Sequence, residues 1–281
     1  MSDLLASFRG EWFKVTRRPA TWALGLTLAL ILLALGYALL VVLVAVLSSE
    51  PAGRPGVQAG LHTLKMNLAP IHFLQSTLAA FSGIGFGSAI AVILGVLALG
   101  SEYGWSTMKT VFTQRPGRLT VFGGKLLALA LILAILAVIL LACAAGASAV
   151  TGAIYGSPGG WPGVVDIVKG FLACWLIMGL WAAVGVFLAV LFKQAPLAIG
   201  LGIVYAIAIE GLIVNILSVD SSLKNVQRGF PGANATALVN SFGSNAAGAL
   251  VGPTQAILVV AAFLAAFVLV SAVLLRARDV T

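Results

Sequence analysis

The residues best suited to binding a partner gather in one stretch, 100–118 (GSEYGWSTMKTVFTQRPGR). It combines a carboxylate at Glu102 with cations at Lys109, Arg115 and Arg118, and aromatic side chains lie among them. Such a mixture offers another protein both charge-assisted hydrogen bonds and an aromatic anchor. The simpler alternative is a hairpin between two membrane spans, with its aromatic and basic side chains anchored at the lipid headgroups.

Catalytic chemistry finds little support in the sequence. There are two histidines and two cysteines, Cys143 and Cys174, and each cysteine lies inside a hydrophobic run outside any CxxC pattern. We find no paired carboxylates, no His/Cys cluster and no Ser–His arrangement at one membrane depth. We therefore expect no catalytic residue, no metal site and no cofactor in this chain.

A nucleotide site is also rejected. The residues Gly123-Gly124-Lys125-Leu126 resemble the end of a P-loop, but no Ser or Thr follows Lys125. These four residues begin an apolar run, and no strand pattern precedes them, as it would in a P-loop. Any ATP hydrolysis must come from a separate protein, so we expect that the chain by itself is not an enzyme.

The composition indicates an integral membrane protein. Of 281 residues, 61% are hydrophobic and 9% are charged, and the mean hydropathy is +1.12. A water-soluble fold cannot cover that much apolar surface. The net charge of +8 fits loops that touch anionic lipids better than it fits nucleic-acid binding, and we expect no nucleic-acid partner.

Long apolar runs predict an all-α membrane protein, a single transmembrane domain over residues 1–281. Runs of 18 or more apolar residues can cross the bilayer as helices, and they are too long and too uniformly apolar for barrel strands. The six expected spans cover about 22–47, 75–99, 121–150, 168–192, 195–217 and 254–275.

The distribution of Lys and Arg predicts the orientation. With the N-terminus inside, the cytoplasmic segments hold eleven of the 16 Lys and Arg residues, and the external segments hold the other five. The positive-inside rule therefore places both termini in the cytoplasm. Stretch 100–118 becomes a cytoplasmic segment, and 218–253 becomes an external loop with apolar parts that a re-entrant helix would explain.

Residues 3–18 have the pattern of an interfacial amphipathic helix. Leu4, Phe8, Trp12 and Val15 share one face at helical spacing, and charged residues occupy the others. Such a helix lies in the membrane interface, where lipids are its partners, and Pro19 ends it before the first span.

Glu210 is the acidic residue expected deep in a span. Ala198, Gly202 and Ala206 precede it at intervals of four, so it falls on a small-residue face that packs against other helices. One interpretation is that Glu210, together with Tyr205 and Asn215, contacts a cation or a substrate amine in the translocation path. The other is that Glu210 is a protonated, hydrogen-bonded packing residue. A similar stripe predicts close helix packing, within one subunit or between two, and consists of Gly83, Gly87, Ala91 and Gly95.

Several short motifs together resemble those of permease subunits of ABC-2-type ABC transporters. The first group is Gly100-Ser-Glu-Tyr103, Ser106-Thr-Met-Lys-Thr110 and Arg115-Pro-Gly-Arg118, followed by Gly124-Lys125. Glu11-Trp-Phe-Lys14 matches an N-terminal E-x-x-K pattern, and Arg276-Ala-Arg278-Asp279 matches a C-terminal R-x-R-D pattern. The resemblance extends over the whole chain in its layout of spans, although Trp105-Ser106 departs from the small residue and glycine common there.

The resemblance implies a subunit that works with a second permease copy or paralogue and with two cytoplasmic ATPase subunits, which bind ATP and Mg. It implies an exporter in the inner (cytoplasmic) membrane that operates by alternating access. The residues implied in ATPase coupling are Glu11, Lys14, Glu102, Tyr103, Trp105, Thr107, Lys109, Arg115 and Arg118. The competing interpretations are a stand-alone ion-coupled carrier or channel that uses Glu210, and a membrane anchor for a cytoplasmic complex.

Overall fold

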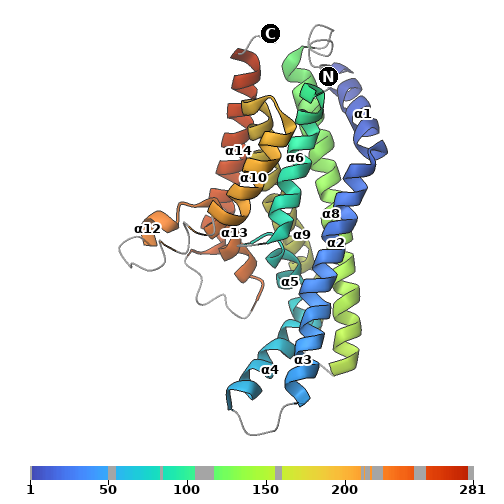
Figure 1. Cartoon of the computed structure of the whole chain (residues 1–281), viewed down its shortest axis with the longest axis vertical. Coiled ribbons are helices and arrows are strands. Elements are labelled where there is room, and N and C mark those ends of the chain that lie inside the picture. Colours follow the sequence, from blue (N-terminus) through green and yellow to red (C-terminus); the bar gives the residue numbers. More distant parts are fainter. Residues whose placement is uncertain are drawn as a thin grey trace.

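The chain forms an elongated bundle of helices. The computed structural model describes residues 2–49, 55–82, 85–104, 117–155, 160–209, 212, 216, 224–243 and 251–277. Every regular element in this part is helical, which confirms the all-α prediction for the described residues. In Figure 1, α1 (Ser2–Arg17) and the C-terminal end of α14 (Pro253–Ala277) lie at the same end of the bundle.

Within the described residues, four helices are long and apolar enough to cross a membrane. The first is a continuous run made of α2 (Pro19–Leu33), the π-helical turn η1 (Ala34–Ala38) and α3 (Leu39–Ser49). The others are α8 (Arg118–Tyr155), α9 (Val164–Phe192) and α14. They overlap the expected spans 22–47, 121–150, 168–192 and 254–275, because unbroken hydropathy over about 20 residues is a strong local signal.

The expected span 75–99 is not one helix. It divides into α5 (Phe73–Ala79) and α6 (Phe86–Gly104), so this prediction is corrected. Between them the backbone N–H of Gly87 donates to the Ala80 carbonyl at 2.9 Å, and a Cβ at Gly87 would lie 2.6 Å from that oxygen. The fully buried Trp181 of α9 donates its indole N–H to the Phe81 carbonyl at 3.3 Å. Polar backbone freed by the break is thus bonded inside the protein, as a membrane requires.

Helices α6 and α9 form the closest pair in the core. A Cβ at Gly95 would collide with the carbonyl of Ala182, and one at Gly185 would collide with the carbonyl of Val92. The two backbones therefore touch because both crossings lack a side chain. The pair is extended by α10 (Ala195–Val204) and the π-helical turn η3 (Tyr205–Ile209), and a Cβ at Gly202 of α10 would meet Val92. The expected span 195–217 is continuous helix as far as Ile209 in the described residues.

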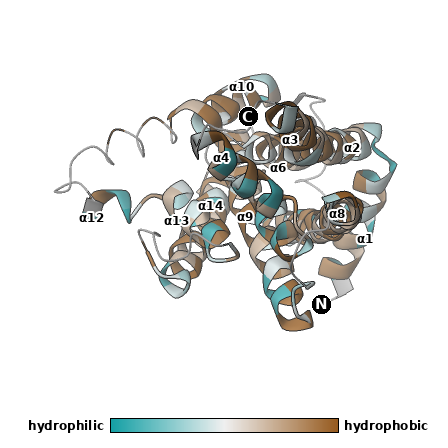
Figure 2. Ribbon diagram, turned by 90° about the horizontal axis from the view of Figure 1, so that it is seen from below, coloured by the Kyte–Doolittle hydropathy of each residue, from teal (hydrophilic) through white to brown (hydrophobic). Residues whose placement is uncertain are grey.

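Among the shorter helices are α4 (Pro55–Asn67), η2 (Pro70–His72), α12 (Lys224–Gln227) and α13 (Pro231–Asn240). In Figure 1, α4 lies at the end opposite α1, while α12 and α13 lie to one side of the bundle. Figure 2 shows hydrophilic residues on α4 and α12, while the long helices are mostly hydrophobic. Within the expected loop 218–253, α13 is largely buried and packs on α14 and α5. Asn234 is fully buried, and its amide nitrogen donates to the carbonyls of Arg228 and Phe230 at 2.8 Å.

Candidate functional site: the junction of helix 1 and helix 8

Helix α1 rests on the first turns of α8, and two consecutive glycines permit the contact. A Cβ at Gly124 would lie 2.5 Å from Ser7 Oγ and 3.0 Å from the backbone nitrogen of Phe8. One at Gly123 would lie 3.2 Å from Leu4 Cδ1. The pair that resembles a P-loop in sequence therefore has a packing role: it lets α1 approach the backbone of α8 closely.

A buried ion pair joins the two helices at this crossing. Glu11 of α1 is 6% exposed and Lys125 of α8 is 3% exposed. The Lys125 ammonium donates to Glu11 Oε2 at 2.9 Å, and Lys14 donates to Oε1 at 2.8 Å. Both carboxylate oxygens are therefore occupied by cations of the same chain. A buried carboxylate is tolerated only when it is paired and hydrogen-bonded in this way.

The electrostatics of Glu11 favour its charged form. Burial alone raises the pKa of a carboxyl, but the Lys125 charge and the hydrogen bonds from Lys14 and Lys125 outweigh that effect. The pKa of Glu11 consequently lies below its ordinary value of 4.5. At neutral pH the junction is held by an ionised carboxylate between two ammonium groups.

A second set of contacts fixes the bend between α1 and α2. Arg18 stands between the two helices, and its guanidinium donates to the Leu97 carbonyl of α6 at 3.0 Å. The Trp22 indole N–H donates back to the Thr16 carbonyl at 2.8 Å. Because α2 begins at Pro19, which has no N–H to donate, the chain can turn there without losing a helical hydrogen bond. Contacts of this kind thus join α1 to α2 and to α8.

The outward face of α1 carries basic and aromatic side chains. Arg9, Lys14 and Arg17 are exposed, and Phe13 is 62% exposed. The Arg17 guanidinium lies 5.4 Å from the centre of the Phe13 ring. The predicted interfacial helix at 3–18 is therefore a helix whose inner face binds α8 and whose outer face presents cations and a ring.

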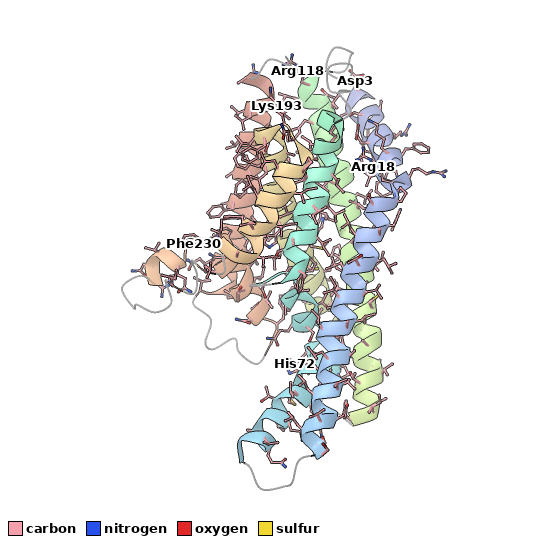
Figure 3. All side chains as sticks on the ribbon, in the orientation of Figure 1. Asp3, Arg18, His72, Arg118, Lys193 and Phe230 are labelled. Atoms are coloured by element: carbon pink, nitrogen blue, oxygen red, sulfur yellow. The ribbon has the colours of Figure 1, made fainter. Side chains whose placement is uncertain are left out.

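The predicted coupling segment begins beside this junction. Glu102 and Tyr103 occupy the last turn of α6, and Arg118 is the first residue of α8. Figure 3 shows Arg118 and Asp3 at the same end of the molecule. Of the remaining predicted coupling residues, Glu11 and Lys14 belong to the junction itself. Those outside the described residues are Trp105, Thr107, Lys109 and Arg115.

The candidates inside the membrane separate into two groups. Glu210, Asn215 and Gly83 lie outside the described residues. Tyr205 opens the η3 turn, and its ring packs on Trp181 with centroids 6.3 Å apart. The other small residues face helices of the same chain and are Gly87, Ala91, Gly95, Ala198, Gly202 and Ala206.

Sequence reasoning missed the partner of Glu11. Lys125 looked like the end of a nucleotide motif, and Glu11 looked like a contact for an ATPase. The available signal was a lysine just inside a span, where an unpaired cation is costly, combined with a glutamate on a neighbouring amphipathic helix.

With this geometry established, comparison with known proteins gives one family. A family model described as ABC-2 family transporter protein matches residues 7–209. The match includes α1, the junction and the core helices α6 and α9. Among curated proteins, none matches this chain.

Proposed function

The chain belongs to the ABC-2 transporter family, and from this premise we propose that it forms the translocation path of an ATP-driven exporter. Such a permease supplies the bundle, and the energy comes from separate subunits. We assign ATP and Mg binding to two cytoplasmic ATPase partners and pair the chain with a second permease copy or paralogue. The family is generally paired with ATP-binding subunits, which supports the assignment.

We further propose six membrane crossings with both termini in the cytoplasm, in the inner membrane. The four long helices account for four crossings, and the shorter apolar helices 86–100 and 195–209 are candidates for the other two. The common end of α1 and α14 supports an even number of crossings. The excess of Lys and Arg in the segments at that end supports its cytoplasmic location.

The observation that carries the coupling mechanism is the Glu11–Lys125 pair. It ties a short peripheral helix to the start of a long apolar helix at 2.9 Å. We propose that ATPase closure pushes on α1 and on segment 100–118, and that the pair transmits the push to α8. Glu11 then acts as a positioning residue, because both of its oxygens are already bound within the chain.

The proposed movement divides the bundle into a rigid part and a movable part. The contact of Gly95 with Ala182 joins α6 to α9 along their backbones, and a packed pair of this kind moves as one body. The α1–α2 arm meets this body through Arg18, which donates to the Leu97 carbonyl of α6, and it is joined to α8 by the Glu11–Lys125 pair. Alternating access would consist of tilting the arm and α8 against the α6–α9 pair.

The competing function is a stand-alone carrier that uses Glu210. The family match favours the ATP-driven exporter instead, because it assigns a transporter type whose energy comes from partner subunits. The two functions differ in which residue is indispensable. The exporter requires the cytoplasmic segment, and the carrier requires Glu210.

The decisive experiment is purification of the tagged chain in mild detergent from its own host, followed by identification of co-purifying proteins and an assay of ATP hydrolysis. We expect an ABC ATPase to co-purify, and the variant Glu102→Lys to lose it while still inserting in the membrane. Asp166→Lys is the matched control: it reverses one exposed carboxylate in the first turn of α9, at the opposite end of the bundle.

If the chain purifies alone, hydrolyses no ATP and loses transport with Glu210→Gln, the exporter proposal fails and the carrier takes its place. If Asp166→Lys releases the ATPase as completely as Glu102→Lys does, the docking assignment of segment 100–118 is wrong.

A further inference from the structure

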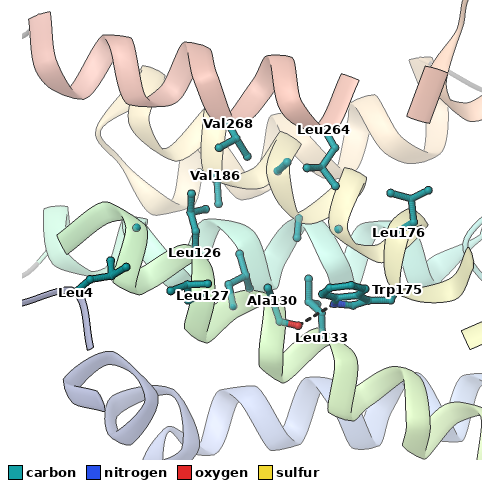
Figure 4. Close-up of a pocket in the computed structure, with 15 residues that line it drawn as sticks. Leu4, Leu126, Leu127, Ala130, Leu133, Trp175, Leu176, Val186, Leu264 and Val268 are labelled. Atoms are coloured by element: carbon teal, nitrogen blue, oxygen red, sulfur yellow. Dashed lines mark hydrogen bonds between the residues drawn. The ribbon is translucent and has the colours of Figure 1, made fainter. Parts of the chain in front are cut away.

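An apolar groove lies between α8 and α14. Its volume is about 660 Å³, within the range of about 300–1,000 Å³ usual for ligand sites. Helix α9 forms its floor through small residues, among them Gly179 and Ala183, while Leu264 of α14 and Ala130 of α8 belong to the walls. Figure 4 shows Leu4 of α1 at one end of this groove and Trp175 toward the other.

The walls of the groove offer no hydrogen bond to a ligand among the described residues. The polar group in the lining is the Trp175 indole N–H, and it already donates to the Ala130 carbonyl at 2.8 Å. The other lining side chains are aliphatic or absent. A polar occupant would lose its own hydrogen bonds on entering, so the occupant must be a hydrocarbon.

The three helices that form the groove all end in a cation on the same side. Arg118 begins α8, Lys193 caps the C-terminus of α9, and Arg276 lies in the last turn of α14. Lys193 and Arg276 are exposed, and Arg118 is half-buried. Figure 3 shows Arg118, Lys193 and Asp3 at this end of the molecule.

The spacing between the groove and these cations matches one lipid molecule. Val186 and Val268 line the groove, and they precede Lys193 and Arg276 by two helical turns, or roughly 10–12 Å at 1.5 Å per residue. An acyl chain in the groove would therefore place its phosphate near the cations. The positive charge of these side chains complements an anionic headgroup, because Lys and Arg near a membrane surface attract anionic lipids.

We propose that this groove binds one acyl chain of an anionic phospholipid, whose phosphate is held at Lys193 and Arg276. The acyl chain gains little free energy by moving from the bilayer into the groove, because the surrounding lipid tails are as apolar as the groove. Selectivity therefore comes from the headgroup, and the groove fixes its position. The inference rests on the proposed function only in assigning this end to the cytoplasmic leaflet. Because Leu4 lines the groove, the bound lipid touches the helix that we propose receives the ATPase push.

The test counts lipids that stay bound to the purified full chain. Bound lipid is removed from the purified protein with detergent. The protein is then titrated with phosphatidylglycerol or phosphatidylcholine, and the bound lipids are counted by native mass spectrometry. We expect one phosphatidylglycerol to bind at least tenfold more tightly than phosphatidylcholine. Lys193→Asn/Arg276→Gln, which removes the cations, should lower that affinity about tenfold or more. Ala130→Phe places a ring where the acyl chain would lie, so the phosphate is no longer positioned at the cations, and this variant should lower the affinity as well.

Two matched variants separate this site from general lipid contact. Ala262→Phe adds the same ring at an exposed position of α14, and Arg9→Gln/Arg17→Gln removes the same charge from the outer face of α1. Both should retain the lipid. The proposal is overturned if the two lipids bind equally, or if the controls lose phosphatidylglycerol as fully as the groove variants. The assay needs no ATPase, so its result is independent of whether the exporter proposal holds.

Discussion

The carboxylate of Glu11 lies 2.9 Å from the ammonium of Lys125, across the contact between a peripheral helix and a long apolar helix. Both side chains are almost fully buried. Each needs the other, since an ion removed from water without a partner destabilises a fold by several kcal/mol. This ion pair therefore fixes the position of α1 on α8.

Removing one member of the pair should lower the free energy of unfolding far more than removing both members. We expect Glu11→Met to lower the free energy of unfolding by about 3–5 kcal/mol, because it removes the carboxylate that binds the buried Lys125 ammonium. The double variant Glu11→Met/Lys125→Met should recover most of this loss. The measurement is thermal unfolding in detergent, with Lys14→Met as control: the Lys14 side chain is 44% exposed, and its loss should cost about 1 kcal/mol or less. A double variant as unstable as the single one would contradict the idea.

The junction should stay closed at neutral pH and open only in acid. The folded-state pKa of Glu11 is lowered from 4.5, so the pair contributes its full stability above that value and loses it as the pH falls through the lower folded value. We expect protease cleavage between α1 and α2 to be flat from neutral pH down to about 5 and to rise in more acidic buffer. In Glu11→Gln, this rise in acidic buffer should be absent. A transition near neutral pH in the unmodified chain would argue against an ionised Glu11.

Two glycines of the same helix should respond oppositely to alanine. Gly124→Ala places a methyl group against Ser7 and the Phe8 backbone, so it should push α1 away and cost roughly 1–3 kcal/mol. Gly146→Ala meets nothing within 4 Å and should be neutral or stabilise α8 by up to about 1 kcal/mol. Cysteine cross-linking of α1 to α8, combined with thermal unfolding, distinguishes the two. Equal behaviour of the variants would show that Gly124 does not seat α1.

Backbone contact between α6 and α9 should make Gly95 and Gly185 intolerant of any side chain. Gly95→Ala and Gly185→Ala each drive a methyl group into a carbonyl of the facing helix, and we expect more than about 3 kcal/mol of destabilisation or failure to accumulate. Gly200→Ala on α10 has open space and is the control. The measurement is the yield of monodisperse protein after size-exclusion chromatography. Normal yield for Gly95→Ala would disprove the close packing.

The break between α5 and α6 should depend on one indole. Trp181→Phe keeps an aromatic side chain but removes the five-membered ring of the indole, and with it the donor to the Phe81 carbonyl. The lost hydrogen bond alone should cost about 1–3 kcal/mol in a buried setting. Trp175→Phe removes a similar bond to Ala130 from a side chain that is 37% exposed and should cost less. Thermal unfolding of the two variants side by side tests this, and a larger loss for Trp175→Phe would refute it.

Resemblance to the family was available from short motifs, and the family match confirms it over residues 7–209. The motifs also directed attention to Glu11, although not to what it does. A motif specifies residue types along the chain, and it does not specify which of two partners, an external ATPase or a helix of the same chain, binds a carboxylate.

By itself the sequence determined the membrane class and the long helices, because hydropathy and helix length are local properties that twenty consecutive residues define. Only the tertiary structure decided the rest. The break after Ala79 relies on Trp181, a hundred residues after the carbonyl of Phe81 that it binds. The position of α1 on α8 depends on the ion pair between Glu11 and Lys125. The groove exists because α8 and α14 both pack on α9 without covering it. Each of these features pairs residues far apart in the chain, and such pairing is settled by packing and by the cost of leaving polar groups unpaired in the membrane.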